Sequence, residues 1–360
     1  MLYWHQKPIS FFSMIQKPVS ATEIEGEFMK PTIMQVAERA QVSKATVSRV
    51  LNRNPQVKED IKERVLKAIE ELGYRPSAIA RNLATSRSNM IGLILPDITN
   101  PYFPVLARGI EDAAHRLGYA LFISNTDNDP KLELEYIHKM VEQQVGGIVL
   151  ISASLDEEAV HDLTSLKTPI VLCDRLIDGA PFDAVLIDDY RAAYEAVRFL
   201  SSQGHVRIAH MAGPKNIQSA ENRKRGYLDA MRDAGLEPFV SAGSFHYESG
   251  LHQMDAVIEE YRPTALFAAN DLVALGAIQQ AQRRGLRVPD DIAVIGCDDI
   301  PFGQMSSPAL STISIPVYQI GVTAVQLLED RMKGGKPGTR NVILEHRLIH
   351  RESCGGVERK

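Results

Sequence analysis

The spacing of apolar residues between positions 32 and 52 predicts two short helices separated by a tight turn. Thr32 followed by Gln35 forms a capping box, which marks the start of a helix, and apolar residues then recur at helical spacing. Ser43 is a second N-cap signal, and the residues after it form another apolar stripe. Two helices in this arrangement are typical of a helix-turn-helix, whose second helix can lie in the major groove of DNA.

The polar face of the second predicted helix distinguishes a DNA-binding helix from an ordinary surface helix. It offers hydrogen-bond donors and no carboxylate, through Lys44, Thr46, Ser48, Arg49 and Asn52. Such side chains suit phosphate groups and the edges of bases. Two surface helices of an unrelated helical domain are the alternative, and the donor-rich face favours the DNA-binding interpretation.

A third helix and a short basic segment follow in the predicted N-terminal domain. Apolar spacing predicts the third helix over residues 58–72, ended by Gly73. Its expected apolar stripe consists of Ile61, Val65, Leu66, Ile69 and Leu72. Residues 77–85, which begin after Pro76, are rich in alanine and contain a basic residue. A helix this short is unstable alone, so we expect it to form only against a partner such as DNA.

From residue 90 onward, apolar runs alternate with amphipathic helical segments. The predicted strands cover residues 91–95, 120–124, 147–151, 169–173, 206–211, 265–268 and 292–296. The predicted helices cover residues 104–117, 131–144, 157–166, 223–234 and 272–284. Apolar strands alternating with helices predict a parallel sheet with helices on both faces. Because the alternation restarts near residue 206, we expect an α/β core of two doubly wound lobes, with a ligand cleft at the carboxyl ends of the strands.

Charge is distributed unevenly along the 360 residues, although the whole chain has a net charge of only −5. Residues 29–88 contain 12 lysines and arginines against 6 acidic residues, a net charge of +6, whereas residues 89–360 carry −10. A basic block on an acidic body predicts a polyanionic partner for the block alone. The length allows two or three domains.

The cysteines and the first residues bear on the cellular compartment. Cys173, Cys297 and Cys354 are far apart and form no CxxC pair, which fits a reducing cytoplasm and argues against a disulfide framework or a zinc site. No apolar run approaches the length of a transmembrane span. Prolines and a lysine interrupt residues 1–28, so this stretch does not form a signal-peptide core. We expect residues 1–28 to be disordered or to precede a native start at Met29.

Six short motifs occur along the chain in a characteristic order. They are Thr-Val-Ser-Arg-Val-Leu-Asn at residues 46–52, Tyr-Arg-Pro at 74–76, Gly-His at 204–205, Arg-Lys-Arg-Gly-Tyr at 223–227, Ala-Asn-Asp at 269–271 and Gly-Cys-Asp-Asp at 296–299. In order and spacing they resemble the lac repressor/galactose repressor (LacI/GalR) family of transcriptional regulators, from residue 30 to about residue 351. The chain departs from the family at Gln41, where glycine is usual, so the turn must accommodate a residue with a side chain.

The resemblance implies a helix-turn-helix domain and a hinge helix joined to a two-lobed core like that of periplasmic binding proteins. It assigns base reading in the major groove to Lys44, Ala45 and Arg49, and a wedge in the minor groove to Leu83. A core position in the hinge region is the alternative for Leu83. The candidate DNA contacts are Thr32, Ser43, Lys44, Ala45, Thr46, Ser48, Arg49, Asn52, Ala80, Arg81 and Leu83.

The domain boundaries expected from the resemblance follow the chain in order. They are 29–75 for the helix-turn-helix domain, 76–89 for the hinge helix and linker, 90–187 with 314–341 for the first lobe, 188–313 with 342–351 for the second lobe, and 352–360 for the tail. The chain should therefore cross between the lobes near Asp188 and Ser314. Two hinge helices at one operator imply a homodimer on pseudo-palindromic double-stranded DNA.

The resemblance also implies an effector site in the cleft. Its candidate residues can bridge hydroxyl groups or cover a sugar ring, and they are Asn100, Tyr102, Phe103, Asp174, Arg175, Arg223, Phe245, Asn270 and Asp298. For each residue alone, a loop-capping bond or a surface ion pair is the alternative. Arg175 makes a sugar acid or a phosphorylated sugar an option beside a neutral sugar. The sequence predicts no metal and no cofactor.

Three classes of function are compatible with this fold. A ligand-responsive repressor of carbohydrate-utilisation genes accounts for the basic block. A sugar-binding protein of a transport system shares the two lobes but leaves that block unexplained. An enzyme such as a nucleotide-dependent dehydrogenase would require a GxGxxG after a strand, and none follows a predicted strand. A regulator that answers to a phosphoprotein partner is a further option, and the sequence does not decide whether ligand releases DNA or promotes its binding.

Overall fold

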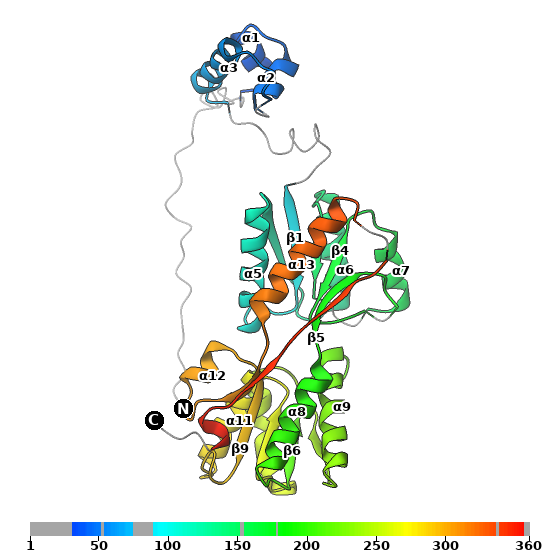
Figure 1. Cartoon of the computed structure of the whole chain (residues 1–360), viewed down its shortest axis with the longest axis vertical. Coiled ribbons are helices and arrows are strands. Elements are labelled where there is room, and N and C mark those ends of the chain that lie inside the picture. The colour runs from blue at the N-terminus through cyan, green and yellow to red at the C-terminus, as the bar shows by residue number, and fades with distance from the viewer. Residues whose placement is uncertain are drawn as a thin grey trace, which may run out of the picture. The chain divides into compact units, whose positions relative to one another are not determined.

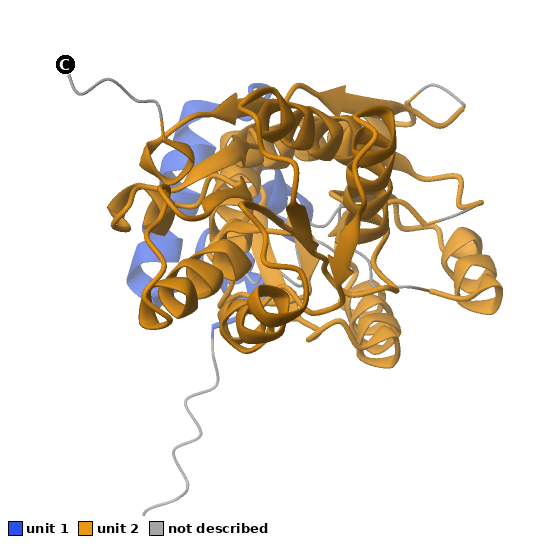
Figure 2. Cartoon of the chain, turned by 90° about the horizontal axis from the view of Figure 1, so that it is seen from below, with its two compact units in different colours: residues 1–86 blue, residues 87–360 orange. Residues whose placement is uncertain are grey.

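The computed structural model describes residues 31–51, 54–74, 89–151, 155–177, 179–335 and 338–355 (Figure 1). The chain divides into two units, residues 1–86 and residues 87–360, which Figure 2 distinguishes by colour. Helices α1 to α3 belong to the first unit, and every strand of the described residues belongs to the second.

The described part of the first unit consists of three helices, α1 (Ile33–Arg39), α2 (Lys44–Leu51) and α3 (Glu59–Leu72). The predicted capping box is confirmed at α1. The backbone N–H of Thr32 donates to Gln35 Oε1 at 2.8 Å, and that of Gln35 donates to Thr32 Oγ1 at 3.4 Å. Ser43 caps α2 by accepting a bond from the N–H of Thr46 at 3.1 Å. α3 ends at Gly73, whose φ of 60° lies in the left-handed region that favours glycine.

The three helices enclose a small apolar core. Its buried members are Val36, Ala37, Ala40, Val47, Val50, Val65, Ala68 and Tyr74. The predicted stripe of α3 is wrong at one position, because Leu66 is 49% exposed and Ala68 is buried. Successive residues of a helix are rotated by about 100°, so Leu66 points away from the face that carries Val65 and Ala68.

The turn between α1 and α2 accommodates Gln41 in a left-handed conformation, with φ of 53°. A residue with a Cβ adopts this conformation at a cost, so the surrounding structure must hold it. Arg64 of α3 does so: its Nη2 donates to the carbonyl oxygens of Ala40 at 2.6 Å and of Gln41 at 3.0 Å. The turn therefore keeps its geometry without glycine.

The second unit contains two six-stranded sheets among its described residues, one in each lobe (Figure 1). The first sheet has the order β11-β5-β4-β3-β1-β2, from β1 (Met90–Leu95), β2 (Ala120–Asn125), β3 (Ile148–Leu150), β4 (Ile170–Cys173), β5 (Asp183–Ile187) and β11 (Asn341–Leu344). The second has the order β12-β10-β9-β8-β6-β7, from β6 (Ile208–Met211), β7 (Phe239–Ser241), β8 (Ala265–Ala268), β9 (Ala293–Asp298), β10 (Ser311–Ser314) and β12 (Arg347–Ile349). All described neighbours pair in parallel except β10 and β12, which confirms the predicted α/β class.

Helices cover both faces of each sheet. In the first lobe, one face carries α5 (Tyr102–Arg116) and α13 (Val317–Met332), and the other carries α6 (Pro130–Glu142) and α7 (Glu157–Ser165). In the second lobe, one face carries α8 (Asp189–Ser202) and α9 (Gln218–Asp233), and the other carries α10 (Tyr247–Glu260) and α11 (Asp271–Arg283). The short helices α12 (Pro301–Met305) and η1 (Glu352–Cys354) follow β9 and β12. None of the described helices has the length and hydropathy needed to cross a lipid bilayer.

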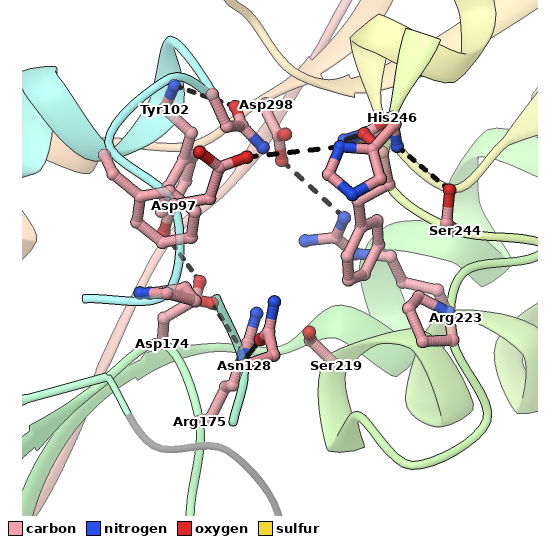
Figure 3. Close-up of a pocket in the computed structure, with 16 residues that line it drawn as sticks. Asp97, Tyr102, Asn128, Asp174, Arg175, Ser219, Arg223, Ser244, His246 and Asp298 are labelled. Atoms are coloured by element: carbon pink, nitrogen blue, oxygen red, sulfur yellow. Dashed lines mark hydrogen bonds and ion pairs between the residues drawn. The ribbon is translucent and has the colours of Figure 1, made fainter. Parts of the chain in front are cut away.

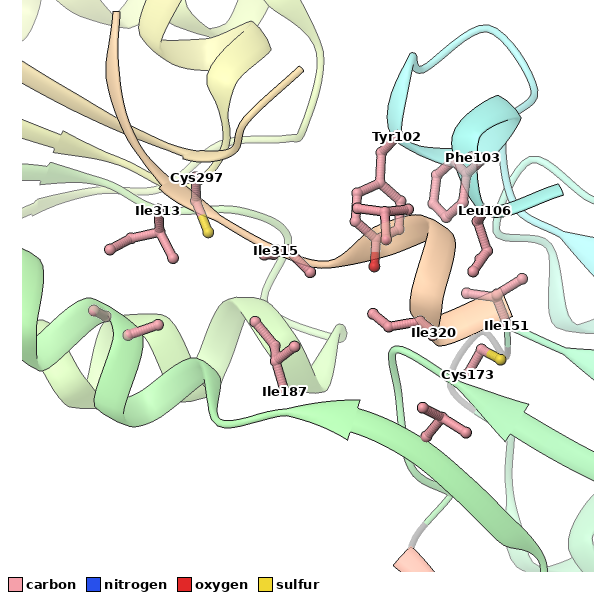
Figure 4. Close-up of a cluster of buried hydrophobic side chains, with 14 of the residues drawn as sticks. Tyr102, Phe103, Leu106, Ile151, Cys173, Ile187, Cys297, Ile313, Ile315 and Ile320 are labelled. Atoms are coloured by element: carbon pink, nitrogen blue, oxygen red, sulfur yellow. The ribbon is translucent and has the colours of Figure 1, made fainter. Parts of the chain in front are cut away.

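Within the described residues, the chain crosses between the lobes three times. The first two crossings, after β5 and after β10, lie at the predicted positions near Asp188 and Ser314. The third lies between β11 and β12, so residues 342–344 belong to the first sheet and not, as expected, to the second lobe. β11 is short and half-exposed, which is why its apolar pattern did not predict it. Buried isoleucines, among them Ile187, Ile313 and Ile315, line the crossings within a core that extends into both lobes (Figure 4).

Several other elements differ from the sequence pattern. The strand at residues 120–124, expected to be buried throughout, lies at the edge of its sheet, and Phe122 and Ile123 are 44% and 45% exposed. The pattern also did not predict β5, β7, β10, β12, α8, α10, α12 and α13. These strands have three to five residues, and short segments carry little periodicity.

Close helix packing explains why the Arg-Lys-Arg-Gly-Tyr motif has glycine at position 226. A Cβ at this position would lie 2.2 Å from the carbonyl oxygen of Tyr190, so only glycine lets α8 and α9 approach this closely. The neighbouring Tyr227 is fully buried, and its hydroxyl donates to the carbonyl oxygen of Ile208 at 2.8 Å. The motif thus fixes α9, which carries Arg223, against the second sheet.

Candidate functional site

All nine effector candidates line one pocket between the lobes of the second unit (Figure 3). The pocket encloses about 610 Å³, part of it open to solvent. Asp174 follows β4, Asn270 follows β8 and Asp298 ends β9, so the polar groups converge because the carboxyl ends of parallel strands meet at one edge of each sheet. That these residues bind an effector is taken up below as a proposal.

Arg223 of α9 is the charged centre of the pocket wall formed by the second lobe. Its Nε donates to Asp189 Oδ1 at 2.7 Å, and its Nη1 donates to the carbonyl oxygen of Ala269 at 2.6 Å. The same Nη1 lies 3.6 Å from Asp298 Oδ1. Burial raises the pKa of Asp189 to about 6 and that of Asp298 well above its ordinary value, against the opposing effect of Arg223.

Asp174 and Arg175 form the corresponding pair in the first lobe. The hydroxyl of Tyr102 donates to Asp174 Oδ1 at 2.6 Å, and burial together with the Asp174 charge raises the pKa of Tyr102 well above its ordinary value. Arg175 Nη1 donates to Asn128 Oδ1 at 2.9 Å, and its Nε lies 3.7 Å from Asp174 Oδ2. Each lobe therefore presents one buried carboxylate–guanidinium pair.

Strained backbone aims the two carboxylates into the pocket. Asp174 has φ of 66°, Asp298 has φ of 118°, and Asp299 has φ of 58°. Residues other than glycine occupy these regions only when surrounding bonds over-determine them, and such residues cluster at ligand sites. In the second lobe the side chain of Arg351 provides one such bond, because its Nη2 donates to Asp299 Oδ1 at 2.6 Å.

Aromatic side chains form the apolar walls. Phe245 comes from the second lobe and lies over Gly213, where a Cβ would approach the ring to 2.6 Å. Tyr102 and Phe103 come from the first lobe and pack edge to face at 5.1 Å between ring centroids. A sugar ring bound between such walls would bury its apolar faces while its hydroxyls reach the charged pairs.

The candidates Asn100 and Asn270 also form local capping bonds, the role that the sequence offered as the alternative to ligand binding. Asn270 caps α11 by accepting a bond from the N–H of Val273 at 2.9 Å, and its Nδ2 donates to the carbonyl oxygen of Phe245 at 2.9 Å. Asn100 accepts a bond from the N–H of Tyr102 at 3.1 Å. Both residues therefore shape the pocket as well as line it.

The sequence pattern missed several lining residues. They are Pro96, Asp97, Asn128, Pro214, Ser219, Ser244 and His246. Asp97 carried a signal, because it lies two residues after a predicted strand. Asn128 carried none, since its bond to Arg175 joins residues 47 positions apart. His246 Nδ1 lies 4.0 Å from Asp97 Oδ2, which brings the two lobes near each other at the pocket.

The first unit presents the predicted donor-rich face on α2. Lys44, Ala45 and Arg49 are exposed, and α2 contains no acidic residue. Ser48 and Thr46 are half-buried, whereas the exposed Thr32 and Ser43 serve as helix caps. The remaining DNA candidates, Asn52, Ala80, Arg81 and Leu83, lie outside the described residues, as does the predicted hinge helix.

The cysteines are structural in the described part of the chain. Cys173, Cys297 and Cys354 are buried and unpaired, and burial raises the pKa of each thiol. A thiol with a raised pKa is a poor nucleophile. Among the described residues, no group of His, Cys, Asp and Glu has the geometry to hold a metal ion.

Comparison with known families identifies both units. Residues 32–77 match the family described as bacterial regulatory proteins, lacI family. Residues 88–352 match the family described as periplasmic binding proteins and sugar binding domain of LacI family.

Individual relatives extend this likeness over most of the chain. Catabolite control protein A of Priestia megaterium is 39% identical over 330 residues, which are 90% of this chain and 99% of that protein. The solved structure of the lac repressor dimer bound to operator and the anti-inducer ONPF has a TM-score of 0.82 at 28% identity, covering 90% of this chain and 99% of that chain. A complex of the transcriptional regulator CelR with cellobiose has a TM-score of 0.69 at 30% identity, covering 90% of this chain and 100% of that chain. The chain belongs to the LacI family of bacterial regulatory proteins, as a DNA-binding transcriptional regulator with a LacI-type sugar-binding domain and not as an enzyme.

Proposed function

We propose that this protein is a cytoplasmic repressor of carbohydrate-utilisation genes whose operator affinity is set by a sugar or sugar acid bound between the lobes. The observation that carries the proposal is the combination in one chain of an α2 face without acidic residues and a pocket lined by paired carboxylates and guanidiniums. A sugar-binding protein without a regulatory role would have no use for such an α2.

The α2 helix supplies the groups for reading DNA. Arg49 can pair with a guanine through two parallel bonds, Ala45 can contact a thymine methyl, and Lys44 can reach a phosphate or a base edge. The capped ends of α1 and α2 and the bonds from Arg64 hold this face rigidly, which is the condition for base-specific contact.

We expect the repressor to act as a homodimer on a pseudo-palindromic operator. Val105 of α5, Leu117 directly after α5 and Ile123 of the adjoining edge strand β2 are 38%, 39% and 45% exposed. Large apolar side chains gathered on neighbouring elements are typical of an association surface. The comparison structure of the lac repressor is a dimer on its operator, which supports the same arrangement here.

The three crossings supply the coupling between pocket and DNA. A ligand that contacts both Asp174 and Arg223 binds better when the lobes are closed, so it shifts the population towards the closed arrangement. Closure turns the lobes about the crossings, which changes how the DNA-binding units of a dimer are spaced. Effector binding and operator binding then influence each other reciprocally.

The test is operator binding by the purified full chain, measured by fluorescence anisotropy on its own upstream DNA across a salt series, with and without sugars and sugar acids. Tight binding with a steep salt slope that one compound alters is the expected result, and its direction shows whether ligand releases or recruits the repressor. Operator binding that no compound alters would favour control by a phosphoprotein partner. Binding no tighter than to unrelated DNA would contradict the repressor function.

A further inference from the structure

We propose that the effector is an uncharged sugar and that the pocket excludes sugar acids and phosphorylated sugars. The inference narrows the effector class of the proposed function and rests on it. It follows from the balance and the pairing of the charges in and directly behind the pocket.

Carboxylates outnumber cations around the bound ligand. Asp97, Asp174 and Asp298 line the pocket, and Asp189 lies directly behind Arg223 at 2.7 Å. Against these four stand two guanidiniums, Arg175 and Arg223, and the imidazole of His246, which lies 4.0 Å from Asp97. Even with Asp298 protonated, as its burial favours, the remaining carboxylates exceed the guanidiniums by one. An added carboxylate or phosphate would therefore enter a site without net positive charge.

Both guanidiniums are already engaged by the protein. Arg223 bonds to Asp189 and to the carbonyl oxygen of Ala269, at 2.7 and 2.6 Å. Arg175 bonds to Asn128 at 2.9 Å and lies beside Asp174. A guanidinium recognises an anion most strongly when it can offer two parallel bonds, and here the bonds to protein oxygens occupy part of each fork.

Two carboxylates of the pocket keep acceptor capacity for a ligand, beside the guanidinium N–H groups that the protein leaves open. Among the described residues, no hydrogen bond is donated to the Asp298 carboxylate, which is 8% exposed and lines the pocket. Asp174 accepts one bond, from Tyr102, and retains acceptor capacity on its other oxygen. A sugar hydroxyl can donate to these oxygens, whereas a carboxylate or a fully ionised phosphate can only accept.

The test compares neutral sugars with their matched acids and phosphates on the full-length protein. The probes are D-glucose, D-gluconate and D-glucose 6-phosphate; D-ribose, D-ribonate and D-ribose 5-phosphate; and cellobiose with cellobionate. Binding is followed by calorimetry, and the effect on operator affinity by anisotropy. We expect at least one neutral sugar to bind and its acid and phosphate to bind at least about tenfold more weakly, because like charges are brought together in a desolvated site.

Two variants show whether charge is the cause. Asp97→Asn removes one carboxylate from the pocket while keeping an oxygen that can accept the bonds from the N–H and hydroxyl of Thr99. This variant should reduce the ratio of the affinity for a neutral sugar to the affinity for its matched acid. Asp290→Asn removes an exposed carboxylate that pairs with Arg287 and does not line the pocket, and it should leave the ratio unchanged.

Several outcomes would overturn the inference. One is an acid or phosphate that binds as well as its neutral counterpart. A second is the failure of every neutral sugar to bind the folded protein. The third is a ratio of neutral-sugar to acid affinity that is the same in the wild type and in Asp97→Asn. Operator binding is measured on the same preparation with and without each compound. Its absence under every condition would contradict the proposed function, whereas intact operator binding with a response to an acid would contradict the charge inference alone.

Discussion

Asp189 of α8 and Arg223 of α9 form a buried ion pair at the base of the pocket, with 2.7 Å between Asp189 Oδ1 and Arg223 Nε and side chains 5% and 4% exposed. The two residues are 34 positions apart, and they meet because Gly226 lets α8 and α9 pack closely. Arg223 also bonds to the end of β8 through Ala269 and approaches Asp298 of β9. One guanidinium thus ties the helix pair to two strand ends in the second lobe.

Removing that guanidinium should affect both stability and ligand response. Arg223→Ala leaves the Asp189 carboxyl buried without its cation, and breaking a buried pair in this way costs about 3–5 kcal/mol. We expect a loss of this size in urea unfolding, together with a lost effector response and retained operator binding below the unfolding transition. Arg225→Ala, two residues away on the exposed side of α9, is the control: it loses only a contact at 5.2 Å with the Tyr190 ring, so it should cost at most about 1 kcal/mol and leave the effector response unchanged. An effector response that survives Arg223→Ala would refute its assignment to the pocket.

Asn270 can be tested for its two roles separately. Asn270→Ser keeps an oxygen that can cap α11 but is too short to donate to the carbonyl oxygen of Phe245, whereas Asn270→Ala loses both bonds. We expect Asn270→Ala to be less stable than Asn270→Ser by about 1 kcal/mol, since that is the usual cost of a lost N-cap. Both should weaken effector binding because the Phe245 wall loosens. Equal stability of the two variants would argue against the capping role.

Replacing Gln41 by glycine should stabilise the first unit. Gln41→Gly relieves the left-handed backbone at φ of 53°, and glycine's larger entropy in the unfolded chain offsets part of the gain. We expect a net stabilisation of about 0.5 kcal/mol of the first unit, read from slower hydrogen exchange of α1 and α2 amides in the full chain. Gln56→Gly, in a loop residue without positive φ, should destabilise the unit instead. Similar losses in both variants would show that the turn is not strained.

His210 should make the second lobe sensitive to acid. It is fully buried between the rings of Tyr227 and Phe267, and burial lowers its pKa to about 4. Between pH 6.5 and pH 4 the unfolded chain binds a proton there and the folded chain does not, so the histidine reduces stability as pH falls, by up to about 3 kcal/mol. Asp189 and Asp271, with pKa values raised to about 6 and about 7, increase the stability of the folded chain as pH falls. The contribution of His210 is therefore measured by comparison with a variant that lacks it.

His210→Phe supplies that comparison. It should be less stable than wild type near neutral pH, by about 1 kcal/mol for the lost bond to the carbonyl oxygen of Phe267, and should gain on wild type as pH falls. Urea unfolding at a series of pH values measures the difference. A difference between His210→Phe and wild type that stays constant across the pH series would contradict the lowered pKa of His210.

Signals that lie within a few residues of each other were sufficient to predict a large part of this molecule. The capping box of Thr32 and Gln35, the stop at Gly73 and the polar residues at the ends of the predicted strands depend on local backbone chemistry. Motif order then identified the effector candidates, all of which line the pocket. Local periodicity was least informative for short strands such as β11 and for the face of α3 that carries Ala68 in place of Leu66.

What only the tertiary structure decided are relationships between distant residues. Asp189 became part of the site through Arg223, Asn128 through Arg175, and Asp97 and His246 through the approach of the two lobes. The third crossing depends on the pairing of β11 with β5, more than 150 residues earlier in the chain. Charge balance in the pocket is likewise a sum over residues from both lobes. The sequence by itself determined the helix-turn-helix, the alternation of strands and helices and the chemical groups at the strand ends, because those follow from local spacing. Which groups neutralise one another was decided by packing, since electrostatic and hydrogen-bond energies depend on separation in space and not along the chain.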